Sequence, residues 1–156
     1  GAKTSGMMQL NMVTLTELTH MVLPAMLERR HGRIMNIASV AAFQACPYFA
    51  VYAATKAYVL SFTEALAAEV ADRGVLVTAV CPGSTATGFH EAANSQGALI
   101  NKISDSAEMV AEEAYKALNN GKTVVVTGLM NKPLPMINRL VPRKTMTWAV
   151  SKVMGR

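Results

Sequence analysis

Apolar residues follow two different spacings along this chain, and each spacing predicts a different element. They recur at helical spacing over residues 7–30 and 50–73, while near-continuous apolar runs fill residues 33–38 and 74–80. The first pattern predicts two long helices, and the second predicts short strands buried on both faces. A strand, a long helix and a second strand in this order predict a right-handed crossover within a parallel sheet.

The rest of the chain is predicted by turn, cap and strand signals. Residues 1–6 have the composition of a loop, and the small, polar residues 88–101 predict a second, mobile loop. A helix is predicted over 104–119, capped by Ser104 or Asp105 with Glu108 at capping-box spacing, and a β-branched strand over 122–127. Residues 131–156 form a basic amphipathic tail. We expect one domain over residues 1–156.

Composition narrows the class of protein. With 51% hydrophobic and 16% charged residues among 156, the chain is expected to fold. No apolar run reaches the roughly 18–20 residues that span a bilayer, and no signal-peptide pattern is present, so we expect a cytoplasmic protein. Much of the net charge of +5 comes from the tail, which argues against nucleic-acid binding. Cysteines and histidines lack metal-ligand spacing, so no metal is expected.

Three polar side chains mark a candidate catalytic site. Ser39 follows the strand 33–38, at the carboxyl end where open α/β sheets bind ligands. Tyr52 and Lys56 lie four residues apart near the start of a predicted helix, and therefore on one face. A nearby ammonium lowers the pKa of a phenol, so the tyrosine is suited to general acid/base catalysis, with Ser39 bonding the substrate oxygen. Tyr-x-x-x-Lys alone is weak evidence, since a core tyrosine beside a solvated lysine gives the same pattern.

The order of these residues resembles the short-chain dehydrogenase/reductase family. Ser39 precedes Tyr52 by thirteen positions, Lys56 follows four later, and a second strand ends in Cys81-Pro82-Gly83. The resemblance implies a Rossmann-like, doubly wound parallel sheet and an oxidoreductase that uses NAD or NADP to interconvert a carbonyl and an alcohol. It implies that Tyr52 exchanges the proton, that Ser39 orients the oxygen, and that Lys56 lowers the Tyr52 pKa and bonds the nicotinamide ribose.

Further roles also rest on the resemblance. The family's proton relay implies a role for Asn11, whose backbone carbonyl would hold a water molecule. The family's Pro-Gly loop, which contacts the nicotinamide end of the cofactor, corresponds here to Pro82, Gly83, Thr85 and Thr87. Tyr48 is a candidate to line the substrate pocket. The implied partners are a small apolar carbonyl or alcohol substrate and further subunits, as a homodimer or homotetramer built through the two long helices.

The family's glycine-rich phosphate-binding turn does not occur before Asn11, and the resemblance covers only the later half to two-thirds of a family domain. The sheet is therefore expected to lack its first strands, which would leave an edge of strand 33–38 bare. We expect a longer parent protein, and little turnover from these 156 residues alone. The alternative function is a non-catalytic remnant or interaction module. The tail is expected to pack over the pocket or a second subunit; an acidic membrane surface is the less favoured partner.

Overall fold

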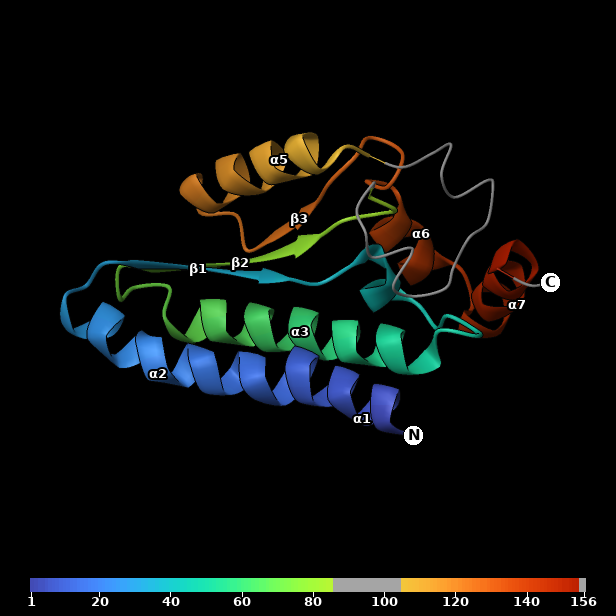
Figure 1. Cartoon of the computed structure of the whole chain (residues 1–156). Helices are drawn as coiled ribbons and strands as arrows, with labels where there is room; N and C mark the ends of the chain where they lie inside the picture. Colours follow the sequence, from blue (N-terminus) through green and yellow to red (C-terminus); the bar gives the residue numbers. More distant parts are fainter. Residues whose placement is uncertain (86–104, 155–156) are drawn as a thin grey trace.

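A three-stranded parallel sheet forms the centre of the computed structural model, which describes residues 1–85 and 105–154. The strands are β1 (Gly32–Ile37), β2 (Val75–Cys81) and β3 (Val124–Val126), in the order β1-β2-β3. Helices α2 (Leu15–Glu28) and α3 (Ala50–Glu69) cover one face, and α5 (Ala107–Asn119) covers the other (Figure 1). The predicted α/β, Rossmann-like class is therefore confirmed.

The apolar runs predicted as strands form the core because β2 is buried along both faces. Val77, Ala79, Val80 and Cys81 are each at most 4% exposed. Toward the amino ends of the strands, Ile34 of β1 packs with residues of α3 and β2 in one cluster. A second cluster, containing Val59, Leu60 and Cys81, lies toward the carboxyl ends. That second cluster supports the part of the sheet where ligands bind in open α/β folds.

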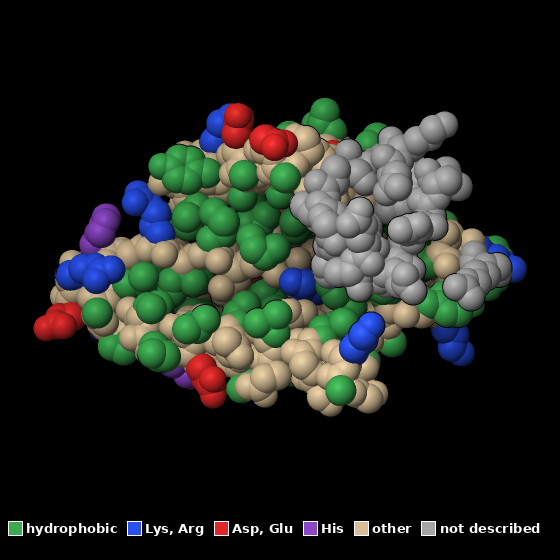
Figure 2. All heavy atoms as spheres, in the orientation of Figure 1, with side chains coloured by type: hydrophobic (Ala, Val, Ile, Leu, Met, Phe, Trp, Pro, Cys, Tyr) green, Lys and Arg blue, Asp and Glu red, His purple; other side chains and the backbone are tan. Residues whose placement is uncertain are grey.

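One edge of β1 has no strand beside it within the described residues. β1 pairs with β2 alone, and Ile37 at its carboxyl end is 50% exposed. Figure 2 shows apolar side chains gathered at the level of the sheet, between the α5 layer and the α2/α3 layer. This agrees with the expected bare edge. Such an edge offers unpaired backbone groups beside apolar surface, which makes it prone to pair with another chain.

The amino-terminal end is helical, so the loop predicted for residues 1–6 is wrong. Helix α1 (Ala2–Met8) continues through a π-helical segment, η1 (Gln9–Thr14), into α2. Because the helix is continuous, its first turns need no separate nucleation, and contacts with α3 add to their stability. Tertiary context here outweighs the low helix propensity of Gly6. The long helix ends at Glu28, two residues earlier than predicted.

Three other elements begin or end at residues that differ from the predicted ones. Helix α3 ends at Glu69 rather than at residue 73, and β3 has three residues in place of six. Helix α5 begins at Ala107, where the Ser106 side chain accepts a hydrogen bond from the Met109 amide at 3.1 Å. The capping predicted for Ser104 or Asp105 is therefore wrong. The loop predicted over 88–101 lies outside the described residues.

The tail folds into two helices, α6 (Leu134–Leu140) and α7 (Arg143–Met154). Figure 1 places both at the end of the molecule toward which the strands point, beside the short 3-10 helix η2 (Val40–Phe43). Val150 of α7 is buried against Cys46 and Ala53. None of the helices within residues 1–85 and 105–154 has both the length and the apolar character to cross a bilayer.

Two glycines test how tightly the elements are joined. Gly74 (φ +76°) precedes β2, and Gly121 (φ +68°) follows α5. A Cβ on Gly74 would overlap the Arg30 carbonyl oxygen, whereas one on Gly121 would meet only Leu76 Cδ2, at 3.7 Å.

Gly121→Ala is expected to lower the free energy of unfolding by about 1–2 kcal/mol, because only the left-handed backbone conformation disfavours alanine there. Gly74→Ala should cost clearly more, since backbone must also move. Urea unfolding of both variants tests this, and equal losses would contradict the tight approach.

Candidate active site

Ser39 lies where β1 and β2 end together. It caps η2, because its Oγ accepts a hydrogen bond from the Ala41 amide at 3.1 Å, and it is 7% exposed. The next amide, that of Val40, donates to the Pro82 carbonyl at 3.0 Å. This bond extends the β1–β2 pairing beyond the strands. It fixes Ser39 beside the Pro-Gly loop that leaves β2.

Tyr52 and Lys56 reach the same place from the first turns of α3. Tyr52 forms a side-chain hydrogen bond with Ser39. The Lys56 Nζ lies 5.8 Å from the centroid of the Tyr52 ring and donates to the Ile37 carbonyl at 2.8 Å. The structure therefore brings together all three side chains that the strand end and the helical spacing predicted.

Burial shifts both ionisable groups toward their neutral forms. It raises the pKa of Tyr52, an effect that the Ser39 hydrogen bond opposes and a nearby Cys46 adds to. It lowers the pKa of Lys56, which Cys81 partly offsets. The predicted lowering of the Tyr52 pKa by Lys56 is therefore wrong for this arrangement, because desolvation has the largest effect and raises the pKa. A tyrosine with a raised pKa is protonated at neutral pH and can donate a proton.

Asn11 connects to the site through a threonine that the sequence analysis missed. Its Nδ2 donates to Thr55 Oγ1 at 3.1 Å, and that hydroxyl donates to the Tyr52 carbonyl at 2.8 Å. Thr55 is 1% exposed. The sequence could have predicted the bond to Tyr52, because a helical threonine often donates to a carbonyl three or four residues earlier. Asn11 itself lies in the π-helical segment, a feature frequent at functional sites.

The Pro-Gly loop is described as far as Thr85. Thr85 Oγ1 donates to the Gly83 carbonyl at 3.4 Å, and Thr85 forms a parallel bridge with Asp105. Gly83 has no room for a Cβ, which would collide with the Asn131 amide. Thr87, which the resemblance also assigns to this loop, lies outside the described residues.

Asn131, which no sequence pattern singles out, connects the end of the sheet to the Pro-Gly loop through Asp105. Its Nδ2 lies 2.9 Å from the Thr127 carbonyl and 3.2 Å from Asp105 Oδ2, donating to both. The Asp105 amide in turn donates to the Ser84 carbonyl at 2.9 Å. These bonds link Asp105 and the segment 127–131 to the loop. They act as a positioning network beside the candidate catalytic residues.

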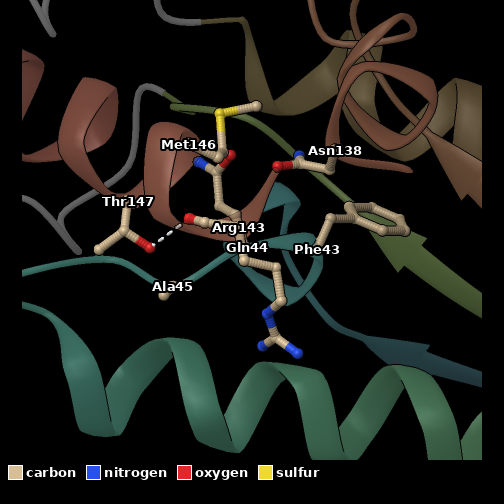
Figure 3. A pocket seen from close by; sticks show the side chains of 7 residues that line it. All are labelled: Phe43, Gln44, Ala45, Asn138, Arg143, Met146 and Thr147. Atoms are coloured by element: carbon tan, nitrogen blue, oxygen red, sulfur yellow. Dashed lines mark hydrogen bonds between the residues drawn. The ribbon is translucent and has the colours of Figure 1, made fainter. Parts of the chain in front are cut away.

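Tyr48 lies in the segment that leads into α3. It is 75% exposed and has a φ of +68°, a strained conformation for a bulky residue. Backbone strain of this kind occurs often at functional sites. The substrate contact of Tyr48 stays a prediction. A cavity of about 30 Å³ lies behind η2, between Gln44 and Thr147 (Figure 3). It has room for water but not for a substrate, and it contains none of the predicted site residues.

Comparison with known proteins identifies the family. A short chain dehydrogenase profile matches residues 2–98, which is more than half of the chain. The chain therefore belongs to the short-chain dehydrogenase/reductase family. A solved short-chain dehydrogenase from Sphingobium yanoikuyae in complex with NADPH is 26% identical, with a TM-score of 0.71, and the match covers 94% of this chain and 54% of that one. A 7beta-hydroxysteroid dehydrogenase structure, 24% identical with a TM-score of 0.80, shares the fold over 92% of this chain and 57% of its own.

Curated relatives are similar over most of this chain. A 3-oxoacyl-[acyl-carrier-protein] reductase from Synechocystis is 42% identical over 131 residues, 78% of this chain and 53% of its own length. The ketoacyl reductase HetN from Nostoc is 34% identical over 126 residues, 80% of this chain and 44% of its own. Mouse 17-beta-hydroxysteroid dehydrogenase type 3 is 30% identical, with 76% and 37% covered. The chain thus spans about half the length of the curated relatives it matches.

The thiol beneath the site gives a test of its burial. Cys81 is fully buried, which raises its pKa from 9.0 to about 12. An unfolded thiol ionises first as the pH rises, so the stability linked to Cys81 is complete below pH 9 and declines up to about pH 12. Relative to Cys81→Ala, the protein should lose about 2 kcal/mol between pH 8 and 10.5. Urea unfolding at both pH values measures this; parallel pH profiles would show that the folded thiol titrates normally.

Proposed function

We propose that this chain carries the catalytic residues of an NAD(P)-dependent oxidoreductase that interconverts a carbonyl and an alcohol. The observation that supports this is the Ser39–Tyr52 hydrogen bond, formed at the carboxyl end of β1 with the Lys56 ammonium beside the tyrosine ring. These three groups come from two elements and converge where open α/β folds bind ligands. Family membership, and relatives named as reductases and dehydrogenases, agree with this chemistry.

In the reducing direction, Tyr52 acts as the general acid. Lys56 and the Pro-Gly loop would hold a reduced nicotinamide, which when bound would supply the hydride that the carbonyl carbon needs. The carbonyl oxygen takes the Tyr52 proton as the C=O bond becomes a single bond, and the product is an alcohol. The raised pKa of Tyr52 keeps its proton available at neutral pH. Ser39, bonded to the same hydroxyl, orients the substrate oxygen and polarises it.

Lys56 fits the nicotinamide end of the cofactor. Its bond to the Ile37 carbonyl uses one of three ammonium donors, which leaves capacity for ribose hydroxyls. The Lys56 ammonium would also stabilise the Tyr52 phenolate that forms when the proton passes to the substrate. Pro82, Gly83 and Thr85 border the same place at the end of β2, as the assignment to the cofactor requires. Thr87 remains a predicted cofactor contact, and both NAD and NADP remain candidates.

Asn11 is assigned a positioning role. Through Thr55 it supports the backbone of Tyr52, so it sets where the first turns of α3 lie. The relay water on its backbone carbonyl is a separate prediction from the family resemblance. Breaking the side-chain link would shift the tyrosine without removing any group that contacts substrate.

The proposed substrate is a small apolar carbonyl or alcohol. The relatives are named for 3-oxoacyl and hydroxysteroid substrates, which share a ketone or alcohol on an apolar body. Tyr48, exposed beside the start of α3, is the proposed substrate contact of this chain.

Subunit association is proposed through the long helices. An open groove of about 270 Å³ lies between α3 and the η1/α2 helix, where Met12, Val13 and Tyr58 line it. Leu18 and Met21 of α2 are 55% and 76% exposed. Burying such side chains against a second copy would remove a large apolar area from water.

Tyr52→Phe tests the general acid. In the whole protein, kcat for an acetoacetyl thioester or a steroid ketone should fall by about 100-fold or more, because the proton donor is lost while the ring stays in place. Oxidation of NADPH or NADH follows the reaction by absorbance. Tyr115→Phe, on the exposed face of α5, is the matched control and should keep full activity. Turnover within a few fold of the parent for Tyr52→Phe would refute the assignment and favour a non-catalytic module.

Lys56→Met tests the cofactor contact. Both the affinity for NAD(P)H and kcat should fall, since one ammonium is assigned to the ribose and to the phenolate. Fluorescence titration of the reduced cofactor gives the first quantity, and steady-state kinetics gives the second. Lys116→Met removes an ammonium paired with Glu112 on the α5 surface and serves as the control. A loss of kcat with unchanged cofactor affinity would argue against the ribose contact.

A further inference from the structure

The positive charge of this protein is concentrated in its tail. Residues 131–156 contain six of the chain's 15 lysines and arginines and no acidic residue. The preceding 130 residues carry nine basic and 10 acidic side chains, so they hold almost no net charge. Among the described residues, only Lys132 of the tail forms an ion pair, with Glu113 at 3.6 Å. The basic side chains of α6 and α7 themselves form no ion pair with an acidic side chain of the described residues.

Apolar side chains are exposed on the same two helices. Met136, Ile137, Leu140, Trp148, Val153 and Met154 are between 40% and 86% exposed. With the basic Arg139, Arg143, Lys144 and Lys152 they form what is called here the tail surface. Figure 2 shows Lys and Arg side chains beside apolar ones at this end of the molecule. The buried part of α7, at Val150, packs on Cys46 and Ala53, so the helix is fixed while its other side stays open.

Spacing along α7 places a tryptophan between two lysines. Lys144, Trp148 and Lys152 are each four residues apart, so they form one exposed row on the helix. Tryptophan favours the boundary between lipid head groups and acyl chains, and lysines extend from it to reach the head groups.

Three polar side chains of these helices form hydrogen bonds within their own helix. Thr147 Oγ1 donates to the Arg143 carbonyl at 2.8 Å, and Ser151 Oγ donates to the Trp148 carbonyl at 2.7 Å. Asn138 Nδ2 likewise donates to the Leu134 carbonyl at 3.0 Å. These groups need no outside partner, so placing the helices against an apolar layer leaves few donors unpaired.

We propose that the tail surface docks on the head-group region of an anionic lipid bilayer. The protein lies on the surface with Trp148 at the acyl boundary and the basic side chains against lipid phosphates. A second copy of the same face is a poorer partner, because a two-fold contact would bring unpaired positive charges together. The phosphates of a nucleic acid would pair with the basic side chains but would leave the exposed apolar side chains in water. The inference rests on the tail alone and not on the proposed function.

Trp148 is the only tryptophan of the chain, so its fluorescence reports on this surface directly. Vesicles of phosphatidylcholine mixed with phosphatidylglycerol should shift its emission to the blue and carry the protein into the pellet on centrifugation. Pure phosphatidylcholine vesicles should bind far less, and added salt should weaken the anionic binding. Brominated lipids in the anionic vesicles should quench the emission.

Two charge variants separate the tail from the rest of the surface. Lys144→Gln with Lys152→Gln should weaken binding to the anionic vesicles by about ten- to thirty-fold. Lys3→Gln with Lys122→Gln removes the same charge from exposed sites outside the tail and should change binding little. Trp148→Ser should weaken pelleting, whereas Tyr115→Ser, equally exposed on α5, should not. Circular dichroism melting confirms that each variant is folded.

Several results would overturn the proposal. One is an unshifted Trp148 emission with anionic vesicles, and another is equal binding by the two charge variants. An emission shift that follows protein concentration without lipid would assign the surface to a second copy. A shift with a DNA or RNA duplex, but not with vesicles, would assign it to nucleic acid.

Discussion

The candidate site depends on the pairing of β1 with β2 continuing past the ends of both strands. The Ala38 amide donates to the Val80 carbonyl at 2.7 Å, and the Val40 amide donates to the Pro82 carbonyl at 3.0 Å. These two bonds flank Ser39 and hold its backbone beside the Pro-Gly loop. Because α3 packs on β1 and β2, its first turns bring Tyr52 and Lys56 to the same point. The parallel register thus places serine, tyrosine and lysine before any ligand contributes.

The same packing that positions these groups also sets their protonation. Burial raises the Tyr52 pKa and lowers that of Lys56, so the neutral phenol is favoured and the ammonium is held less firmly. A buried phenol is a proton donor at neutral pH. An anion formed there during reaction would need the Lys56 charge more than the resting phenol does. In the proposed reaction, Lys56 would therefore act on the charge that develops on Tyr52 and not on the resting phenol.

Features set by residues close together in the sequence could be predicted, and features set by contacts between distant residues could not. Ser39, Tyr52 and Lys56 were predictable, because a strand end and a four-residue helical spacing place them. The bond of Thr55 to the Tyr52 carbonyl is local, but its contact with Asn11, 44 positions away, is encoded in no local pattern, and neither is the contact of Asn131 with Asp105, 26 positions away. The helix at residues 1–6 was missed for the same reason, since its continuity and its contacts with α3 outweigh local composition. The Tyr52 pKa was misjudged because burial cannot be read from spacing.

The tail helices connect the outer surface to the segment that carries the candidate catalytic residues. Asn138 of α6 and Thr147 of α7 line the small cavity behind η2, the helix that Ser39 caps (Figure 3). Val150 packs on Ala53, the residue after Tyr52. A force that fixes α6 and α7 would thus also fix the backbone on both sides of the Ser39–Tyr52 hydrogen bond. If the tail surface lies on a bilayer, the candidate catalytic residues lie close to that bilayer, where the proposed apolar substrate would be more concentrated than in water. Membrane contact would then act on substrate supply and on the rigidity of the site together.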